Sequence, residues 1–279
     1  MPRFWNCCKN GPPPMADAAL ADRIDGIAQL GSVVRAMTGI AGARARTARA
    51  QVTAVDAYAE KMVAAYAQVA GSADLPIADM RPALVLFCAE QGFVGAYSER
   101  VLDAADTENA DLFVIGSRGA VIAEARGLVP VWSAPLPARS ASVPKFADQV
   151  LAAVLAQGKL RPVGVVHTIW SKGQAQVTQR ALYPFVPQSG EPQQPSPLHN
   201  IALGDLVVDI ALDRLHADMT RAALHAFAAE NEARMAAMSA AARQIDEELE
   251  RLNALARRER QESITAEIIE IASGALAAG

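Results

Sequence analysis

Residues 224–256 read "LHAFAAENEARMAAMSAAARQIDEELERLNALA", and the spacing of their apolar side chains decides the fold. A seam with alternating steps of four and three residues consists of Leu224, Ala228, Asn231, Met235, Met238, Ala242, Ile245, Leu249, Leu252 and Ala256. Such a heptad period is typical of a helix in a left-handed coiled coil. No proline follows Pro197, and no glycine lies between Gly204 and Gly274. We therefore expect one coiled-coil helix over residues 203–279, roughly 100 Å long at about 1.5 Å per residue.

A second seam of the same period lies near the N-terminus, and twelve of its fourteen positions are apolar or aromatic. Its positions are Ile24, Ile27, Gly31, Val34, Thr38, Ala41, Ala45, Ala48, Val52, Val55, Ala59, Met62, Tyr66 and Val69. The alternative, an amphipathic helix on a globular core, typically spans about 8–20 residues. We predict a coiled-coil helix over residues 15–75 that pairs antiparallel with the C-terminal helix. Alanines in the middle of the seam allow a close approach of the two.

The segment between the two seams alternates strand-like and helix-like stretches, which favours a small Rossmann-like α/β domain over residues 82–184 with a mostly parallel sheet. The expected strands are 83–89, 110–116, 128–134, 162–171 and 175–185. The expected helices are 96–105, 120–126 and 143–158. Residues 185–202 are rich in proline and glutamine, which predicts a loop. The fold class is thus α/β plus a long antiparallel α-helical coiled coil.

The composition excludes several kinds of protein. The chain has 279 residues, a net charge of −4 and three cysteines, which provide neither a disulfide framework nor zinc spacing. Cys88 lies in an apolar run and is expected to be a buried thiol in a reducing, cytosolic compartment. Residues 1–14 lack the apolar core of a secretory signal, so we interpret them as a disordered leader or a start-site artefact. No apolar run reaches the length of about 18 residues that a transmembrane helix needs.

The residues also offer no evident site for catalysis, a cofactor or a metal ion. None of the four histidines stands with Cys, Asp or Glu at the spacing of a known metal motif. Residues 90–97 and 115–121 place glycines after strands, but neither stretch matches a P-loop or a dinucleotide fingerprint. Tight strand-to-helix turns with positive φ explain these glycines better. A basic cluster without interleaved aromatic residues gives little reason to expect a nucleic-acid partner, and it consists of Arg35, Arg44, Arg46 and Arg49.

Both ends of the chain resemble the gamma subunit of F-type ATP synthases. The C-terminal match covers residues 230–277 and includes Glu230, Ala233-Arg234-Met235, Ala237-Met238, Arg260-Gln261, Ile264-Thr265, Glu267, Glu270-Ile271 and Gly274-Ala275. The N-terminal match includes Arg23-Ile24, Arg35-Ala36-Met37, Ile40-Ala41, Arg44 and Arg46. Between them, Gly92-Phe93-Val94-Gly95 and Ile115–Gly119 resemble weakened forms of the family's two glycine turns. Departures such as Ser98 and the proline-rich loop indicate a divergent branch, which would fit a second, alternative ATPase of its organism.

The resemblance implies a rotor stalk without catalytic, cofactor-binding or metal-binding residues of its own. The implied partners are alpha and beta subunits, three of each, the epsilon subunit and the membrane c-ring, at the cytoplasmic face of the bacterial inner membrane. The implied contacts with alpha and beta are made by Arg260, Gln261, Thr265, Glu267, Met37, Arg35 and Arg44. Two other functions stay open on the residues alone: a coiled-coil scaffold or adaptor that carries an α/β module, and an enzyme with its site in that module.

The polar stretch 257–262, "RRERQE", continues the C-terminal helix without a helix-breaking residue. Arg260 follows Ala256 by four residues and precedes Ile264 by four, so we expect it at a position that the seam would give to an apolar side chain. This placement would make sense if the shorter partner helix has ended and the tip of the longer helix faces a protein sleeve.

Overall fold

A computed structural model gives the structure of the chain over most of its length. It describes residues 15–70, 75, 78–156, 160–185 and 198–277. The proposed leader 1–14 and most of the proline-rich loop lie outside the described residues. No described helix combines the length and the apolar character that crossing a membrane requires.

The chain divides into two compact units, and two long helices span both of them. The helices are α1 (Met15–Ala70) and α5 (Leu203–Ala277), and each contributes residues to both units. Unit 1 contains residues 1–38 and 238–279, and unit 2 contains residues 39–237.

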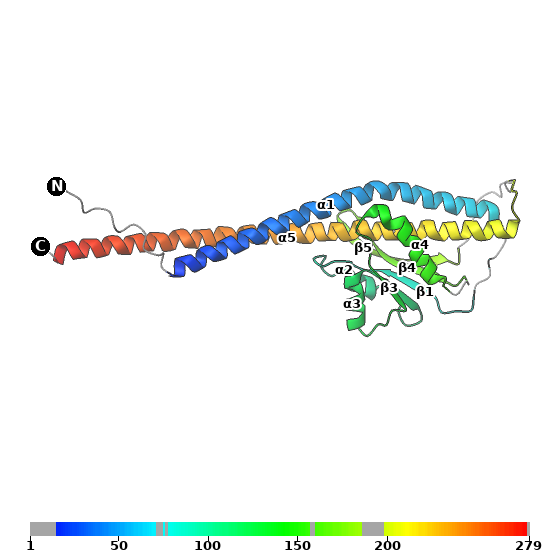
Figure 1. Ribbon diagram of the computed structural model, residues 1–279, viewed down its shortest axis with the longest axis horizontal. Coiled ribbons are helices and arrows are strands. Elements are labelled where there is room, and N and C mark those ends of the chain that lie inside the picture. Colours follow the sequence, from blue (N-terminus) through cyan, green and yellow to red (C-terminus); the bar gives the residue numbers. More distant parts are fainter. Residues whose placement is uncertain (1–14, 71–74, 76–77, 157–159, 186–197, 278–279) are drawn as a thin grey trace, which may run out of the picture. The chain divides into compact units, whose positions relative to one another are not determined.

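Unit 2 contains a five-stranded sheet with the order β3-β2-β1-β4-β5. Figure 1 shows the strands gathered beside the unit 2 part of α5. The strands are β1 (Ala83–Phe87), β2 (Asp111–Ile115), β3 (Trp132–Ala134), β4 (Val163–Ser171) and β5 (Gln174–Tyr183). β1 pairs in parallel with β2 and β4, and β2 pairs in parallel with β3. β5 returns antiparallel to β4 through Lys172 and Gly173, whose φ angles of 51° and 78° suit a tight two-residue turn. The sheet is therefore mostly parallel, as the sequence predicts.

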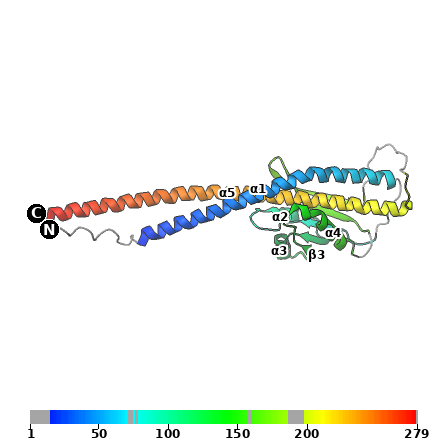
Figure 2. The ribbon, with the colours of Figure 1, turned by 45° about the horizontal axis from the view of Figure 1, so that its top comes forward.

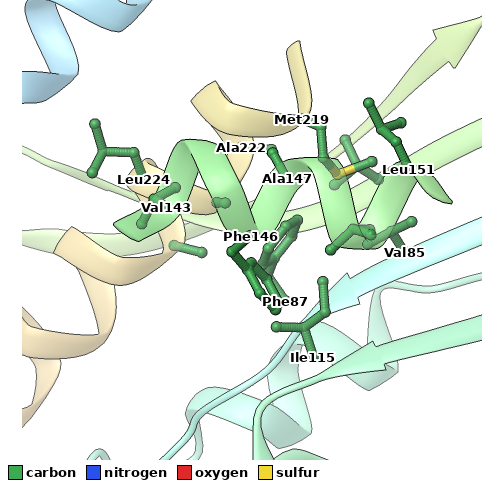
Figure 3. Packing of buried hydrophobic residues seen from close by; sticks show 14 of the residues in the cluster. Val85, Phe87, Ile115, Val143, Phe146, Ala147, Leu151, Met219, Ala222 and Leu224 are labelled. Carbon is green, nitrogen blue, oxygen red and sulfur yellow. The ribbon is translucent and has the colours of Figure 1, made fainter. Parts of the chain in front are cut away.

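Helices cover both faces of this sheet: α2 (Tyr97–Asp103), α3 (Ser117–Ala125) and α4 (Val143–Val154), the last preceded by the short 3₁₀ turn η1 (Ser140–Ser142). Successive side chains of a strand point to opposite faces. On one face, Val85 and Phe87 pack with Phe146 of α4 and Met219 of α5 (Figure 3). On the other face, Leu86 belongs to a cluster that includes side chains of α2 and α3. Burial on both sides explains why β1 reads as a continuous apolar run.

Within unit 2, α1 and α5 lie side by side and antiparallel (Figure 2). The first three α1 seam positions there are alanines, and Ala41, Ala45 and Ala48 are at most 2% exposed. A Cβ atom added to Gly42 would lie 3.1 Å from Met235 Sδ, which shows how closely the helices approach. Small side chains permit this distance because larger ones would hold the helix axes apart.

Unit 1 contains a second antiparallel segment of the same two helices. Val34 of α1 and Leu252 of α5 are buried, and a Cβ atom added to Gly31 would lie 3.0 Å from Ile245 Cγ2. Arg35 Nη1 donates to Asp246 Oδ1 at 2.9 Å across the helix pair. None of the fourteen α1 seam positions and none of the ten α5 positions is classed as exposed, so the heptad prediction is confirmed.

Candidate functional site

The C-terminal turns of α5 carry four of the predicted contact residues. Arg260, Gln261, Thr265 and Glu267 are all exposed. Thr265 Oγ1 donates to the backbone carbonyl of Gln261 at 2.8 Å. This hydrogen bond lies within the helix and does not involve the side-chain amide of Gln261. Among described residues, the Arg260 guanidinium and the Glu267 carboxylate have no hydrogen-bond or ion-pair partner. Both charges are therefore available to another molecule.

The prediction that Arg260 occupies a seam position is wrong. Arg260 is exposed, whereas the neighbouring Glu259 is half-buried, as is Ser263 four residues later. The alternating steps explain the difference: after Leu252 and Ala256 the next step is three residues, which reaches Glu259 rather than Arg260. Arg260 thus points away from the line along which the helix pair meets.

Arg260 instead shares a helix face with a stripe of exposed isoleucines. Ile264, Ile268 and Ile271 are 50%, 60% and 73% exposed, and they continue the row that Arg260 begins at helical spacing. A cationic fork at one end of an apolar stripe provides both a directional contact and a surface that loses little solvation when a partner covers it.

The predicted contact residues of α1 do not join this group. Arg35 and Met37 lie in unit 1, and Arg44 lies in unit 2. Arg35 contacts Asp246, which precedes Arg260 on α5 by about four helical turns, or roughly 21 Å. Met37 and Arg44 are both half-buried. Within unit 1, the surface around Arg35 is therefore separate from the tip of α5.

A second polar site lies at the carboxyl edge of the parallel strands, where sheets of this topology usually bind a ligand. There Glu90, which follows β1, accepts three hydrogen bonds. The donors are Ser117 N at 2.9 Å, Ser117 Oγ at 2.8 Å and Leu136 N at 2.8 Å. Ser117 is the first residue of α3, so its amide is among those that would bind a phosphate at a helix N-terminus. In this chain that amide binds the protein's own carboxylate.

Glycines allow the segments around Glu90 to approach one another. Gly116 has a φ of +105°, and a Cβ atom added there would lie 2.6 Å from the carbonyl oxygens of Cys88 and Ala89. A Cβ atom added to Gly119 would lie 2.0 Å from Cys88 Cβ. The interpretation as tight turns therefore holds for Gly116, while Gly119 is required by a close contact between α3 and the segment after β1.

The backbone after β1 also binds α5 through a buried ionic pair. Glu230 Oε1 accepts hydrogen bonds from the amides of Glu90 and Gln91, both at 3.2 Å. Arg234 donates to Glu230 and to the carbonyl of Gly92, the latter at 3.3 Å. Glu230 and Arg234 are 3% and 6% exposed. Their charges are compensated by each other and by fixed backbone dipoles, which a buried pair requires.

A half-open cavity of about 290 Å³ lies between α1, the β4–β5 hairpin and α5 in unit 2. His225 Nε2 lies 3.1 Å from Asp56 Oδ1, and the His167 ring lies 6.2 Å from the His225 ring. Burial, with smaller effects of His225 and Arg180, lowers the pKa of His167 from 6.5 to about 4. The described residues contain no group of three or more His, Cys, Asp or Glu that could hold a metal ion. His167 is thus a neutral ring at physiological pH.

Comparison with known proteins identifies the family of the chain. A family model described as ATP synthase matches residues 18–278. An ATP synthase gamma chain from Frankia casuarinae is 30% identical over 284 residues, which covers 91% of this chain and 94% of the relative. The chain belongs to the ATP synthase gamma-chain family. An ATP synthase gamma chain from Parafrankia sp. is 28% identical over 281 residues and covers the same shares of both chains.

Solved structures share the fold of this gamma-family chain. A chain from the Euglena gracilis mitochondrial ATP synthase, OSCP/F1/c-ring, in rotational state 3 gives a TM-score of 0.68 at 14% identity, covering 94% of both chains. A chain from the rotor of the same synthase in rotational state 1 gives a TM-score of 0.66 at 13% identity, covering 89% of this chain and 99% of that one. The predicted fold class and the resemblance to gamma subunits are confirmed. Membership in this family is consistent with a non-catalytic subunit.

The sequence did not indicate the polar network around Glu90 in this gamma-family chain. Glu230 and Arg234 belong to the stretch that resembles the family, but the resemblance implies no role for them. A signal was present, because a Glu and an Arg four residues apart face the same side of a helix. Glu90 gave no such signal, since its three donors follow it by 27 and 46 residues.

Proposed function

We propose that this chain is the central rotor stalk of an F-type ATP synthase, which couples rotation of an ion-driven c-ring to ATP synthesis or hydrolysis at the beta subunits. Family membership over residues 18–278 is the observation that carries the proposal. The tip of α5 adds to it, because its Arg260 guanidinium lies beside an apolar stripe and has no partner within the described part of the chain, which suits it to a protein partner.

The proposed partners are alpha and beta subunits, three of each, the epsilon subunit and the c-ring. The proposed location is the cytoplasmic face of the bacterial inner membrane, where the chain is peripheral. Unit 2 exposes several large apolar side chains: Val129, Phe93 and Val121 are 84%, 63% and 61% exposed.

In the proposed mechanism, the rotor changes the relative stability of stator conformations. The planar fork of Arg260 forms two parallel hydrogen bonds with a carboxylate, or bonds to backbone carbonyls, at one rotor angle and loses them at another. Gln261, Thr265 and Glu267 add contacts on neighbouring faces of α5. The isoleucine stripe contributes little angular preference because apolar burial is not directional. Each angle therefore favours one set of stator conformations by differential contact.

The surface on α1 would make a second set of contacts at a different level of the stator. Met37 provides an adaptable apolar side chain, and Arg44 provides a half-buried cation. Arg35 already pairs with Asp246, so a stator carboxylate would have to compete for it.

Co-purification of the tagged chain from its own organism tests the proposal. We expect alpha and beta subunits to elute with it, three of each for every tagged chain, together with epsilon. Recovery of the tagged chain as a soluble monomer would overturn the proposal and leave the scaffold alternative.

A variant that carries Arg260→Ala and Gln261→Ala tests the tip. We expect reduced assembly or reduced ion pumping per ATP hydrolysed, with the helicity of the isolated chain unchanged. The matched control is Arg258→Ala, because Arg258 lies on the same turns but is paired with Glu262 at 2.9 Å. Equal behaviour of the two variants would show that the charge at Arg260 has no special role.

A further inference from the structure

We propose that the carboxyl edge of the sheet is a mechanical joint, in which Glu230 and Arg234 grip the backbone after β1 and Glu90 positions that backbone. Through this joint, torque applied to the α/β domain passes to α5. The inference rests on the proposed rotor function, because only a rotor must transmit torque between these two parts.

The first half of the joint ties the loops of the domain together. Glu90 follows β1, Ser117 follows β2 and Leu136 follows β3, and the Glu90 carboxylate accepts hydrogen bonds from both of the others. One ionised side chain therefore holds three strand ends at donor–acceptor distances of 2.8–2.9 Å. Hydrogen bonds to a carboxylate are shorter and stronger than neutral ones, so these loops move as one piece.

The second half ties those loops to α5. Glu230 accepts from the amides of Glu90 and Gln91, and Arg234 donates to the carbonyls of Gly92 at 3.3 Å and Gln91 at 3.5 Å. Donor and acceptor groups of one short loop are thus bound by an acid and a base one helical turn apart. Tyr97, the first residue of α2, adds a bond from its hydroxyl to the carbonyl of Ala226 at 3.1 Å.

The joint differs in kind from the rest of the contact between the domain and α5. Side chains of α4 such as Phe146 pack with α5 side chains such as Met219 through apolar surface (Figure 3). Apolar burial resists separation of the two surfaces but has no preferred direction for sliding. The hydrogen bonds of Glu230 and Arg234 have fixed distances and angles, so a twist of the domain about α5 stretches them at once.

The topology explains why this edge is available for such a joint. Doubly wound sheets bind anionic ligands at the carboxyl ends of their strands, with a helix N-terminus toward the negative charge. Here the Glu90 carboxylate occupies that position at α3, and the Glu230 carboxylate binds the adjacent backbone amides. These two side-chain carboxylates thus replace an exchangeable ligand. Because they are covalently part of the chain, they can transmit force between the loops and α5.

The experiment compares Glu230→Gln with Glu232→Gln in the assembled complex. Both carboxylates are buried on the same turn of α5, but Glu232 pairs with Arg49 of α1 rather than with the sheet domain. Rotation speed is measured for each complex with probes of low and high viscous drag attached to the rotor at the domain end. We expect Glu230→Gln to lose speed several-fold more than the wild-type complex under high drag while keeping its speed under low drag.

Glu232→Gln should show the wild-type dependence on load even if it lowers thermal stability as much. An equal load dependence of both variants would overturn the joint, because a purely structural role affects both alike. If Glu230→Gln does not assemble, Glu90→Gln provides the same comparison through the loop anchor. A wild-type chain that fails to assemble with alpha and beta would instead overturn the proposed function, so the two failures are distinguishable.

Discussion

Gly116→Ala offers a direct test of the close approach that lets Glu90 reach α3. The new Cβ atom would lie 2.6 Å from two carbonyl oxygens, and φ is +105°, outside the region that L residues adopt with ease. Strain of this kind costs about 1–3 kcal/mol. Relief of the overlap requires movement of the strand end, where Gly116 N donates to Ala134 O at 2.9 Å. Loss of that hydrogen bond and of one neighbouring hydrogen bond costs about 1 kcal/mol each. We therefore expect the free energy of unfolding of unit 2 to fall by about 3–5 kcal/mol.

The assay is urea unfolding followed by tryptophan fluorescence, because Trp132 and Trp170 both lie in the sheet. A loss of about 3 kcal/mol lowers the urea midpoint by roughly 1–3 M, because m is about 1–3 kcal/mol per M of urea. Gly92→Ala is the control: a Cβ atom there meets nothing within 4 Å, and φ is unremarkable. We expect it to be neutral or slightly stabilising. Equal midpoints for the two variants would refute the argument from geometry.

Three further outcomes follow from burial. His167 has a folded pKa of about 4 against 6.5, so the unfolded state takes up a proton first as pH falls. The contribution of a neutral His167 to the free energy of unfolding is fully present above pH 6.5 and declines by about 3 kcal/mol in total as pH falls toward 4. His167→Asn should therefore reduce the pH dependence of the urea midpoint. Burial raises the pKa of the Cys88 thiol to about 12, so little reactive thiolate exists at pH 8. In a variant with the other cysteines replaced by serine, a disulfide reagent at pH 8 should label only the denatured chain. Rapid labelling of the native chain would contradict this prediction. Leu252→Ala should lower the free energy of unfolding by about 2–4 kcal/mol and Leu255→Ala by under about 1 kcal/mol, because these side chains are 3% and 44% exposed. Unfolding followed by helical circular dichroism measures both, and equal losses would contradict the seam.

The helices and strands could be predicted because their signals are local. The heptad seams of α1 and α5 depend on residues three and four positions apart, and the buried strands depend on short apolar runs such as 83–87. The expected strand over 83–89 ends at Phe87 in the structure, since Cys88 and Ala89 turn toward α3. Boundaries of this kind are set by contacts that are distant in sequence.

The candidate site was harder to predict for the same reason. The spacing of Arg260 from Ala256 and Ile264, two steps of four, predicts a seam position, but the heptad period requires a step of three beyond Ala256. The Glu90 network includes hydrogen bonds between residues up to 143 positions apart, so no window of sequence contains it. Family resemblance supplied the identity of the tip residues, but it carried no information about which of their charges are already paired.

One helix, α5, meets three environments, and its composition follows each of them. From Ala217 to Arg234 it lies in unit 2 with nearly every side chain buried, and alanine predominates because neighbours on several sides leave little room. From Arg243 to Ala256 mainly the seam side is covered, so charged residues return on the other sides. Beyond Ala256 most side chains are exposed, yet isoleucines persist. A solvated helix end gains nothing from exposed isoleucine, because burial of such side chains is what stabilises proteins. Their presence beside Arg260, which has no ion-pair partner among the described residues, is accounted for by a partner that covers this end in the assembled complex.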